Sequence, residues 1–492
     1  MESYYITTPI YYVSGKPHLG HAYTTIASDI LARWNRNAGR KVFFLTGTDE
    51  HGQKVEKKAR EQGMEPKEFV DSLIHEFTGM NEHFNISHDY FIRTTYEEHK
   101  NFVQEMLQKA YDKGDIYKDT YKGLYCVDCE KYYTEQDLEE NNCPIHRKPV
   151  EQMDEENYFF KLSKYQDELL KFYEEKPGFL SPSTMRQETI NRVQEGLQDI
   201  SISRNKKTLS WGVELPFDKD HVTYVWFDAL FNYLSALRIN NAEEFWPAQV
   251  HVVGKDIMWF HKVYWPAFLL SVGKELPEKV YAHGWWTVEG EKMGKALGNV
   301  IDPIEFSSKY GVDEFRYFIL TAGTFGEDQD FSFDRFKEKV NSELNDDLGN
   351  LASRIYGMTN KYFDGRIPEG KEFYEKELEL VKASNIYKDF DKAMDELDFT
   401  KAVDLLWGFI RKVNSYINEV EPWREKDKER LATTMNILIS SLKLISGYIE
   451  PLMPDKAKKL RVMYNFNQPH FELKLVDSGG LGEKDRLFEK ID

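Results

Sequence analysis

Apolar positions near the start of the chain recur with the periods of alternating strands and helices. Residues 4–8 have the aromatic and β-branched character of a strand, and a helical repeat follows between residues 21 and 38. That repeat consists of Ala22, Ile26, Ile30 and Trp34. Gly39 stands where a helix would end, residues 42–46 suit a buried strand, and a charged helix is expected from about Gln53. This order predicts an α/β fold with a parallel, Rossmann-like sheet.

The pattern changes further along the chain. Between about residues 117 and 222, turns, cysteines and charge clusters replace the alternation, which predicts an inserted segment. Strand and helix patterns then return in four stretches, at 222–227, 251–253, 258–270 and 280–283. We therefore expect one nucleotide-binding sheet that the insertion splits into two halves.

After residue 331 the pattern becomes helical. Three amphipathic faces follow one another, carried by Phe336, Val340, Leu344, Leu348, Leu351 and Ile355, then by Ala402, Leu405, Leu406, Phe409, Val413 and Ile417, then by Leu431, Met435, Leu438, Leu442 and Ile445. Such faces predict an α-helical bundle. The expected segments are 1–116 and 223–330 for the two halves of the split sheet, 117–222 for the insertion, 331–460 for the bundle and 461–492 for a C-terminal segment.

Composition and charge exclude several classes of protein. The chain has no apolar run approaching the ~20 residues of a membrane span. Its three cysteines all lie between residues 126 and 143, which argues against a disulfide framework and for a reducing, cytoplasmic location. A formal net charge of −18 argues against nonspecific binding of nucleic acid. A nucleic-acid partner would therefore need a local track of basic residues.

Two short motifs have the chemistry of a phosphate site. Pro17-His18-Leu19-Gly20-His21 lies between the first strand and its helix, where backbone N–H groups favour anions and the two imidazoles can donate to phosphate oxygens. The stretch from Glu291 to Asn299 places Lys292 and Lys295 in a glycine-containing loop that can neutralise a departing pyrophosphate. Taken alone, the histidine motif is equally consistent with an ordinary polar helix start. The lysine stretch taken alone is consistent with an ordinary solvated loop. Both follow predicted strands of one sheet, which favours a shared nucleotide site.

Together these motifs resemble the His-Ile-Gly-His and Lys-Met-Ser-Lys-Ser signatures of class I aminoacyl-tRNA synthetases. Gly294 and Ala296 stand where the family has serines, while both lysines are retained. The resemblance implies that His18, His21, Lys292 and Lys295 are catalytic and, with Gly20, bind ATP together with its Mg²⁺.

Longer segments resemble the methionyl members of that family in particular. They are 7–16, 47–52, 225–233, 254–261 and 350–354, and the likeness runs in order along essentially the whole chain. It implies ATP-dependent attachment of L-methionine to tRNA(Met) through a methionyl-adenylate. It also implies methionine contacts from Ile10, Tyr12, Asp49, Trp226, Ala229, Tyr233, Ile257 and His261. Aromatic walls suit a polarizable thioether, but plain core packing is an alternative for these aromatics.

A spacing of Cys126-x₂-Cys129 and Cys143-x₂-His146 predicts a closed, tetrahedral Cys₃His zinc site. Such a set lacks an open position, so we expect Zn²⁺ to hold the insertion together. Three buried thiols with a chance histidine are the alternative. A second metal cluster at the neighbouring Asp49, Glu50 and His51 is disfavoured, because adjacent residues at a strand end rarely converge on one ion.

The resemblance also implies an anticodon-reading end formed by Asn350, Arg354 and Trp423. Asn350 and Arg354 lie one helical turn apart, and a tryptophan can stack on a splayed base. Asp346, one turn earlier, replaces an asparagine of some members. A candidate phosphate track consists of Lys456, Lys458, Lys459 and Arg461. The absence of an appended C-terminal domain favours a monomer.

Other functions stay open at this level. A class I synthetase for cysteine or a branched aliphatic amino acid is one, although the aliphatic enzymes usually carry a large editing insertion and the roughly 100 inserted residues here are few for it. The others are a nucleotidyltransferase for a small molecule and a non-catalytic, zinc-containing tRNA-binding protein. Amino-acid-dependent exchange of pyrophosphate into ATP separates all of these.

Overall fold

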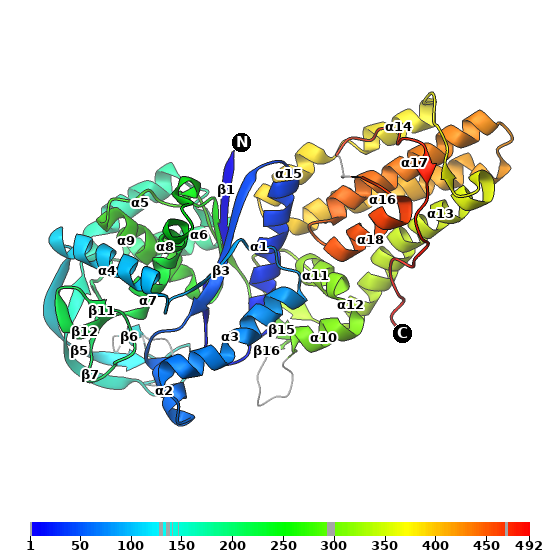
Figure 1. The fold of residues 1–492 in the computed structure, drawn as a ribbon. Helices are drawn as coiled ribbons and strands as arrows, with labels where there is room; N and C mark the ends of the chain where they lie inside the picture. The colour runs from blue at the N-terminus through cyan, green and yellow to red at the C-terminus, as the bar shows by residue number, and fades with distance from the viewer. Residues whose placement is uncertain are drawn as a thin grey trace. The chain divides into compact units, whose positions relative to one another are not determined.

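The computed structural model describes residues 2–126, 131–133, 138–139, 141–145, 147–292, 301–467 and 471–492. The chain folds into two compact units (Figure 1). The sheet unit contains residues 1–17, 40–82 and 87–283, and the helical unit contains residues 18–39, 83–86 and 284–492.

A parallel sheet forms the centre of the sheet unit. Its strand order is β2-β3-β1-β13-β14-β8, with β4 paired to β3, and every pairing is parallel. The strands are β1 (Ser3–Thr7), β2 (Tyr11–Tyr12), β3 (Lys41–Asp49), β4 (Tyr90–Arg93), β8 (Leu180–Ser181), β13 (Val250–Gly254) and β14 (Val280–His283). The predicted parallel, Rossmann-like α/β sheet is therefore confirmed.

Helices cover this sheet, and α4, α8 and α9 lie together beside β1 and β3 in Figure 1. They are α2 (Gln53–Glu61), α3 (Pro66–His83), α4 (Glu97–Asp112), α5 (Gln166–Glu175), α6 (Arg186–Gln194), α7 (Val225–Leu230), α8 (Asn232–Ile239) and α9 (Trp265–Ser271). A π-helical turn, Phe260–Tyr264, leads into α9. Fully buried aromatic side chains such as Phe231, Trp265 and Phe268 join the helices to the sheet.

Antiparallel strands occupy the predicted insertion. One sheet has the order β6-β5-β7-β9 and the other β10-β12-β11. Their bounds are β5 (Ile116–Cys126), β6 (Lys131–Tyr133), β7 (Glu151–Phe160), β9 (Ile200–Ser201), β10 (Ser203–Asn205), β11 (Glu214–Leu215) and β12 (Asp218–Thr223).

Two details differ from the expected pattern. β8 lies within the expected insertion but pairs with β14 in the parallel sheet. The apolar run 222–227 is also not a single strand, since β12 ends at Thr223 and α7 begins at Val225. All six residues of α7 are buried, so its apolar run carries no amphipathic period.

The helical unit contains α1 (Leu19–Asn37), which follows β2 in the chain and ends before Gly39, a residue with the positive φ of +83° expected of a helix terminus. The later helices are α10 (Pro303–Tyr310), α11 (Val312–Thr321), α12 (Phe333–Lys339), α13 (Asn350–Phe363), α14 (Glu375–Ala383), α15 (Tyr387–Asp395), α16 (Phe399–Val420), α17 (Lys428–Ile449) and α18 (Pro454–Tyr464). Short strands complete the unit: β15 (Trp286–Val288), β16 (Glu291–Lys292), β17 (Gln329–Phe331), β18 (Arg366–Ile367) and β19 (Gly479–Gly480).

The three predicted amphipathic faces form the core of this unit. All of their residues are buried except Leu405, which is half-buried. The first face runs without a break through α12, a π-helical segment (Val340–Gly349) and α13. Its apolar residues at 336, 340, 344 and 348 are spaced by four, which suits a helix wider than the α-helix. Within the described residues, every helix is too short or too polar to cross a bilayer.

Candidate functional site

Two of the candidate methionine contacts meet at the carboxyl end of the parallel sheet. Tyr12 and Asp49 are directly opposite in the β2–β3 register, and the N–H of Val13 donates to the carbonyl oxygen of Asp49 at 3.2 Å. Asp49 is buried, while Tyr12 is half-buried with the Lys54 amine 5.7 Å from its ring centre. Ligands bind at this edge in open α/β sheets.

A second group of candidates is linked through His261. Its Nε2 lies 2.7 Å from the Tyr233 hydroxyl and its Nδ1 lies 3.0 Å from the carbonyl oxygen of Ile257. The ring of Trp226 faces His261 edge-on at 6.2 Å and stacks on Phe260 at 3.8 Å. The α7–α8 turn and the start of the π-helical segment thus bring these side chains together.

Burial determines the protonation of His261. It lowers the pKa of the imidazole to about 4, so the ring is neutral at pH 7. A carbonyl oxygen can only accept, so Nδ1 carries the hydrogen and Nε2 accepts from the Tyr233 hydroxyl. The sequence did not predict this pairing, because the two residues are 28 positions apart.

The apolar candidates share one hydrophobic cluster. Trp226 and Tyr233 belong to its buried core, and Ile10, Tyr12 and Ile257 pack against it. Ala229 is also buried, on α7. The structure therefore places all eight predicted methionine contacts in the sheet unit, and it links seven of them, all but Ala229, by register, hydrogen bonds or membership of one hydrophobic cluster.

The segment Asp49-Glu50-His51 has partners other than a metal. Both Glu50 oxygens accept from Arg93, at 2.6 and 2.9 Å, and His51 Nδ1 lies 2.7 Å from an Asp228 oxygen. Glu50 also accepts from the Thr95 hydroxyl at 2.6 Å. Among the described residues, no group of three or more His, Cys, Asp or Glu side chains is placed so that it could hold a metal ion.

The predicted phosphate motif forms the start of α1 in the helical unit. The N–H of Gly20 donates to His18 Nδ1 at 3.1 Å, and the N–H of His18 donates to His21 Nδ1 at 3.0 Å. A nitrogen that accepts an N–H is unprotonated, so each ring carries its hydrogen on Nε2. Burial and the neighbouring His18 lower the pKa of His21 well below its ordinary value. In this arrangement both imidazoles are neutral and carry their hydrogen on Nε2.

Glycine is required at position 20 by this arrangement. A Cβ built there would lie 3.0 Å from Cε1 and 3.2 Å from Nδ1 of His18. The two imidazole rings stack with their centres 3.8 Å apart, so His18 has little freedom to move away. The glycine of the motif therefore lets the first histidine fold back onto the helix start.

The second motif begins in the β15–β16 hairpin of the same unit. Thr287 is opposite Lys292 in the register, and the preceding Trp286 packs edge-on against Tyr23 of α1 at 5.5 Å. The strand of Lys292 is therefore attached to the helix that His18 and His21 begin. Lys295, with residues 293–300, lies outside the described residues.

Half of the predicted zinc ligands fall within the described residues. Cys126 and Cys143 are buried in one small cluster with Tyr133. The Cys143 N–H donates to the carbonyl of Lys148 at 2.9 Å, and the N–H of Arg147 donates to the carbonyl of Cys143 at 2.7 Å, which forms a tight turn around this cysteine. Cys129 and His146 lie outside the described residues.

The candidate anticodon residues lie at the α13 and α16 ends of the bundle. Arg354 on α13 donates to Asn418 in the last turn of α16 at 3.0 Å, and Trp423 follows that helix with 45% of its surface exposed. Asn350 is exposed, with its amide 3.4 Å from Asp346. Asn350 and Arg354 come from α13 and Trp423 from the segment after α16, and all three are exposed.

Acidic partners weaken the predicted phosphate track on α18. The amine of Lys456 lies 2.8 Å from Glu314, and that of Lys459 lies 2.7 Å from Asp485. Lys458 is exposed and Arg461 is half-buried. Two of the four predicted cations are therefore already compensated.

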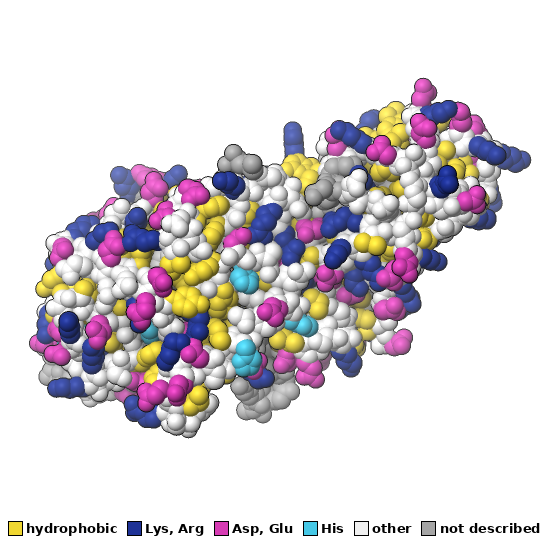
Figure 2. All heavy atoms as spheres, viewed as in Figure 1, with side chains coloured by type: hydrophobic (Ala, Val, Ile, Leu, Met, Phe, Trp, Pro, Cys, Tyr) yellow, Lys and Arg dark blue, Asp and Glu magenta, His cyan; other side chains and the backbone are white. Residues whose placement is uncertain are grey.

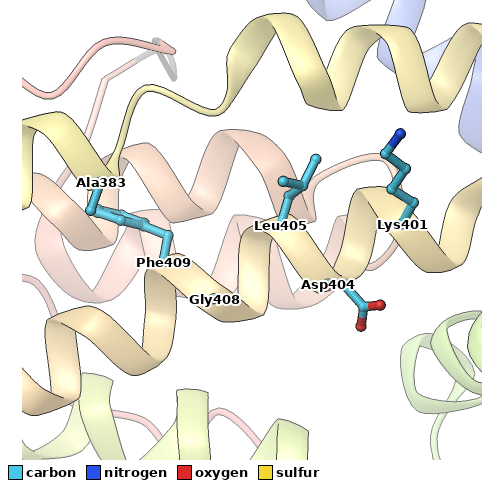
Figure 3. Close-up of a pocket in the computed structure, with 6 residues that line it drawn as sticks. All are labelled: Ala383, Lys401, Asp404, Leu405, Gly408 and Phe409. Carbon is cyan, nitrogen blue, oxygen red and sulfur yellow. The ribbon is translucent and has the colours of Figure 1, made fainter.

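A separate hollow on α16 is lined by Ala383, Lys401, Asp404, Leu405, Gly408 and Phe409, where Leu405 and Lys401 point to one side and Asp404 away from it (Figure 3). None of these six was a candidate site residue.

Comparison with protein-family models gives two matches that together span most of the chain. The model described as "tRNA synthetases class I (M)" matches residues 4–149 and 133–356. The model described as "Anticodon binding domain of methionyl tRNA ligase" matches residues 367–478.

Individual proteins give the same result. The methionine–tRNA ligase of Caldanaerobacter subterraneus is 46% identical over 93% of this chain and 73% of its own length, and that of Thermotoga maritima is 45% identical over 99% and 80%. A solved Mycobacterium tuberculosis methionyl-tRNA synthetase in complex with methionyl-adenylate superposes with a TM-score of 0.94, at 36% identity, over 99% of this chain and 100% of that one. The chain belongs to the methionyl-tRNA synthetase family of class I aminoacyl-tRNA synthetases.

Proposed function

We propose that the chain charges tRNA(Met) with L-methionine in two steps. The methionine carboxylate attacks the α-phosphorus of Mg²⁺-bound ATP to form methionyl-adenylate, and pyrophosphate leaves. The acyl group then passes to a ribose hydroxyl at the end of the tRNA, and AMP leaves. No covalent intermediate with the protein is needed, so positioning and charge stabilisation supply the rate.

The observation that carries this proposal is the linked set of side chains at the carboxyl edge of the sheet. The buried Asp49 carboxylate suits the α-ammonium of an amino acid, and its strand partner Tyr12 begins an apolar wall that continues to Trp226 and Tyr233. A neutral His261, held by Tyr233, places no charge beside a thioether. Such a pocket favours an uncharged, polarizable side chain.

For ATP we propose that His18 and His21 donate through Nε2–H to phosphate oxygens. Both are held in that tautomer by backbone N–H groups. Lys292 and Lys295 would neutralise the charge that develops on pyrophosphate. Mg²⁺ enters with the nucleotide.

The test is exchange of labelled pyrophosphate into ATP across a panel of amino acids. We expect exchange with methionine and none above background with cysteine, isoleucine, leucine or valine. Exchange with one of those amino acids instead would move the assignment to another class I synthetase. Absence of exchange with every amino acid, together with retained tRNA binding, would favour the non-catalytic alternative.

Trp226→Ala is expected to raise the KM for methionine by about tenfold or more while the KM for ATP changes little. The substitution removes the ring that stacks on Phe260 and faces His261, and loss of apolar contacts in a pocket commonly costs this much. Trp226→Phe, which keeps an aromatic ring, is the matched control. Equal increases in both KM values would argue against a side-chain pocket at this position.

We further propose that Cys126, Cys129, Cys143 and His146 hold a structural Zn²⁺. Support comes from the two predicted ligands that the structure describes. Cys126 and Cys143 are buried in one cluster, and a tight turn surrounds Cys143. Thiolate and imidazole are ligands that Zn²⁺ prefers. The ion would tie the tip of β5 to the following turn.

Metal analysis of purified protein is expected to find about one zinc per chain. Cys126→Ala, Cys143→Ala and the double variant should each lose the metal, because a site with three ligands binds zinc far more weakly. Their far-UV circular dichroism checks that the rest of the chain stays folded. Zinc well below one per chain in the unaltered protein, without a chelator, contradicts the proposal.

For the tRNA we propose that Asn350, Arg354 and Trp423 read unstacked anticodon bases. The exposed Trp423 offers a stacking surface, and Arg354 and Asn350 offer donors. On the face drawn in Figure 2, basic and acidic side chains are interspersed over the described residues. A net charge of −18 therefore leaves binding to depend on local groups such as Lys458.

A further inference from the structure

A buried carboxylate between two imidazoles lies beside the candidate methionine contacts. The oxygens of Asp228 lie 2.7 Å from His51 Nδ1 and 2.8 Å from His99 Nε2. The other ring nitrogen of His99 lies 2.7 Å from the hydroxyl of Ser235. His51 is 3% exposed, and Asp228 and His99 are fully buried. None of these residues was a sequence-derived candidate for the site.

The carboxylate of this group is ionised. Burial alone would raise the pKa of Asp228, but the charge of His51 and hydrogen bonds from His51 and His99 outweigh it and lower the pKa to about 2. An ionised carboxylate only accepts, so both facing ring nitrogens carry hydrogens. These are charge-assisted hydrogen bonds, which are roughly twice as strong as neutral ones.

The bridge joins three segments that each carry candidate methionine contacts. Asp228 lies on α7 between Trp226 and Ala229, and His51 lies two residues after Asp49. Ser235, at the far end, lies on α8 two residues after Tyr233. Hydrogen bonds of 2.7–2.8 Å fix the spacing between these segments. A change at either imidazole would therefore move a wall of the pocket relative to Asp49.

We propose that His51 is a positioning residue for methionine, acting through its Nδ1–H bond to Asp228 to fix Asp49 relative to Trp226 and Ala229. The inference rests on the proposed function, since it concerns the same pocket. His51 acts on the substrate only through Asp228, and its Nε2 is not required. His99 supports the opposite oxygen of the same carboxylate through its Nε2.

Asparagine and glutamine separate the two ring nitrogens of a histidine. The amide nitrogen of asparagine takes the place of Nδ1, and that of glutamine takes the place of Nε2. At position 51, asparagine therefore keeps the bond to Asp228 and glutamine loses it. At position 99 the order is reversed, because the bond to Asp228 comes from Nε2.

The experiment measures KM for methionine and for ATP by pyrophosphate exchange in all four single variants. We expect His51→Asn and His99→Gln to stay within about threefold of the unaltered protein. We expect His51→Gln and His99→Asn to raise the KM for methionine by about 10- to 100-fold, with the KM for ATP nearly unchanged. A role in folding alone would not produce this split, nor its reversal between the two positions.

Two outcomes would overturn the inference. Equal KM values for methionine in His51→Asn and His51→Gln would do so, whether both are normal or both are raised. An increase in the KM for ATP as large as the increase in the KM for methionine would also overturn the inference. If His51→Gln does not fold, the two His99 variants decide by the same criteria. Absence of methionine-dependent exchange in the unaltered protein would count against the proposed function instead.

Discussion

Replacing Arg316 with alanine is expected to lower the free energy of unfolding by about 3–5 kcal/mol, the usual cost of breaking a buried ion pair from one side. Arg316 lies on α11 and is fully buried, and its partner Asp29 on α1 is also fully buried. One terminal nitrogen of the guanidinium donates to Asp29 at 2.7 Å and to the carbonyl of Pro451 at 2.9 Å. Loss of the guanidinium leaves the buried Asp29 carboxylate and several carbonyl oxygens with fewer hydrogen-bond donors.

The cost is large because one side chain connects four segments of the helical unit. Arg316 also donates to the carbonyl of Leu452 at 3.1 Å and to that of Phe84 at 2.8 Å. Arg33 satisfies part of the Asp29 carboxylate at 2.9 Å and also reaches Glu450 at 3.2 Å. The network therefore holds α1, the turn at 83–86 and the end of α17 to α11.

Urea unfolding of the single and double variants tests this expectation. Arg316→Lys keeps the charge but has a single nitrogen to serve four acceptors, so an intermediate loss is expected. Asp29→Asn and the double variant Asp29→Asn/Arg316→Ala complete a double-mutant cycle with Arg316→Ala, in which a coupling of more than about 1 kcal/mol is expected. A loss below about 1 kcal/mol for Arg316→Ala would mean that relaxation or water satisfies the stranded groups.

Local patterns predicted those parts of the fold that neighbouring residues decide. The start of the sheet, α1 with its terminal Gly39, and the three buried helical faces all follow from periodicity. The helix α7 could not be separated from a strand, because all six of its residues, Asp228 included, are buried and its apolar residues show no amphipathic period. β8, with only two residues, exists through its pairing to β14 and has no local signal.

In the candidate site, too, contacts between neighbouring residues could be predicted and contacts between distant residues could not. His18, Gly20 and His21 could be found because they interact with one another across three residues. The bond between His51 and Asp228 spans 177 residues and that between His99 and Asp228 spans 129, so no local sequence pattern predicts either bond. The basic run on α18 was visible, but Glu314 and Asp485, which compensate Lys456 and Lys459, approach only in the folded chain.

The start of α1 leads to the second large expected effect. His21→Ala should lower the rate of methionine-dependent pyrophosphate exchange by about 100- to 1,000-fold, the usual cost of removing one donor to a charge that develops in the transition state. The N–H of His18 occupies Nδ1 of His21 and leaves Nε2–H as the donor. His21→Gln, whose amide nitrogen can take the place of Nε2, should retain more activity than His21→Ala. Near-normal exchange in His21→Ala would remove this imidazole from the reaction.

The pH dependence checks the charge state of the same residue. Burial and the adjacent His18 lower the pKa of His21, so the folded protein keeps this ring neutral below pH 6.5, where a histidine in the unfolded chain takes up a proton. The exchange rate is therefore expected to show no loss with a midpoint near pH 6.5, and any loss from His21 should appear only at lower pH. A midpoint near 6.5 that disappears in His21→Gln would contradict the neutral donor, because it would mean that the imidazole titrates normally. We expect an exchange rate that does not change around pH 6.5 and partial activity in His21→Gln. Both results together would mean that the motif acts through neutral N–H groups. The positive charge at the phosphates would then come from lysine.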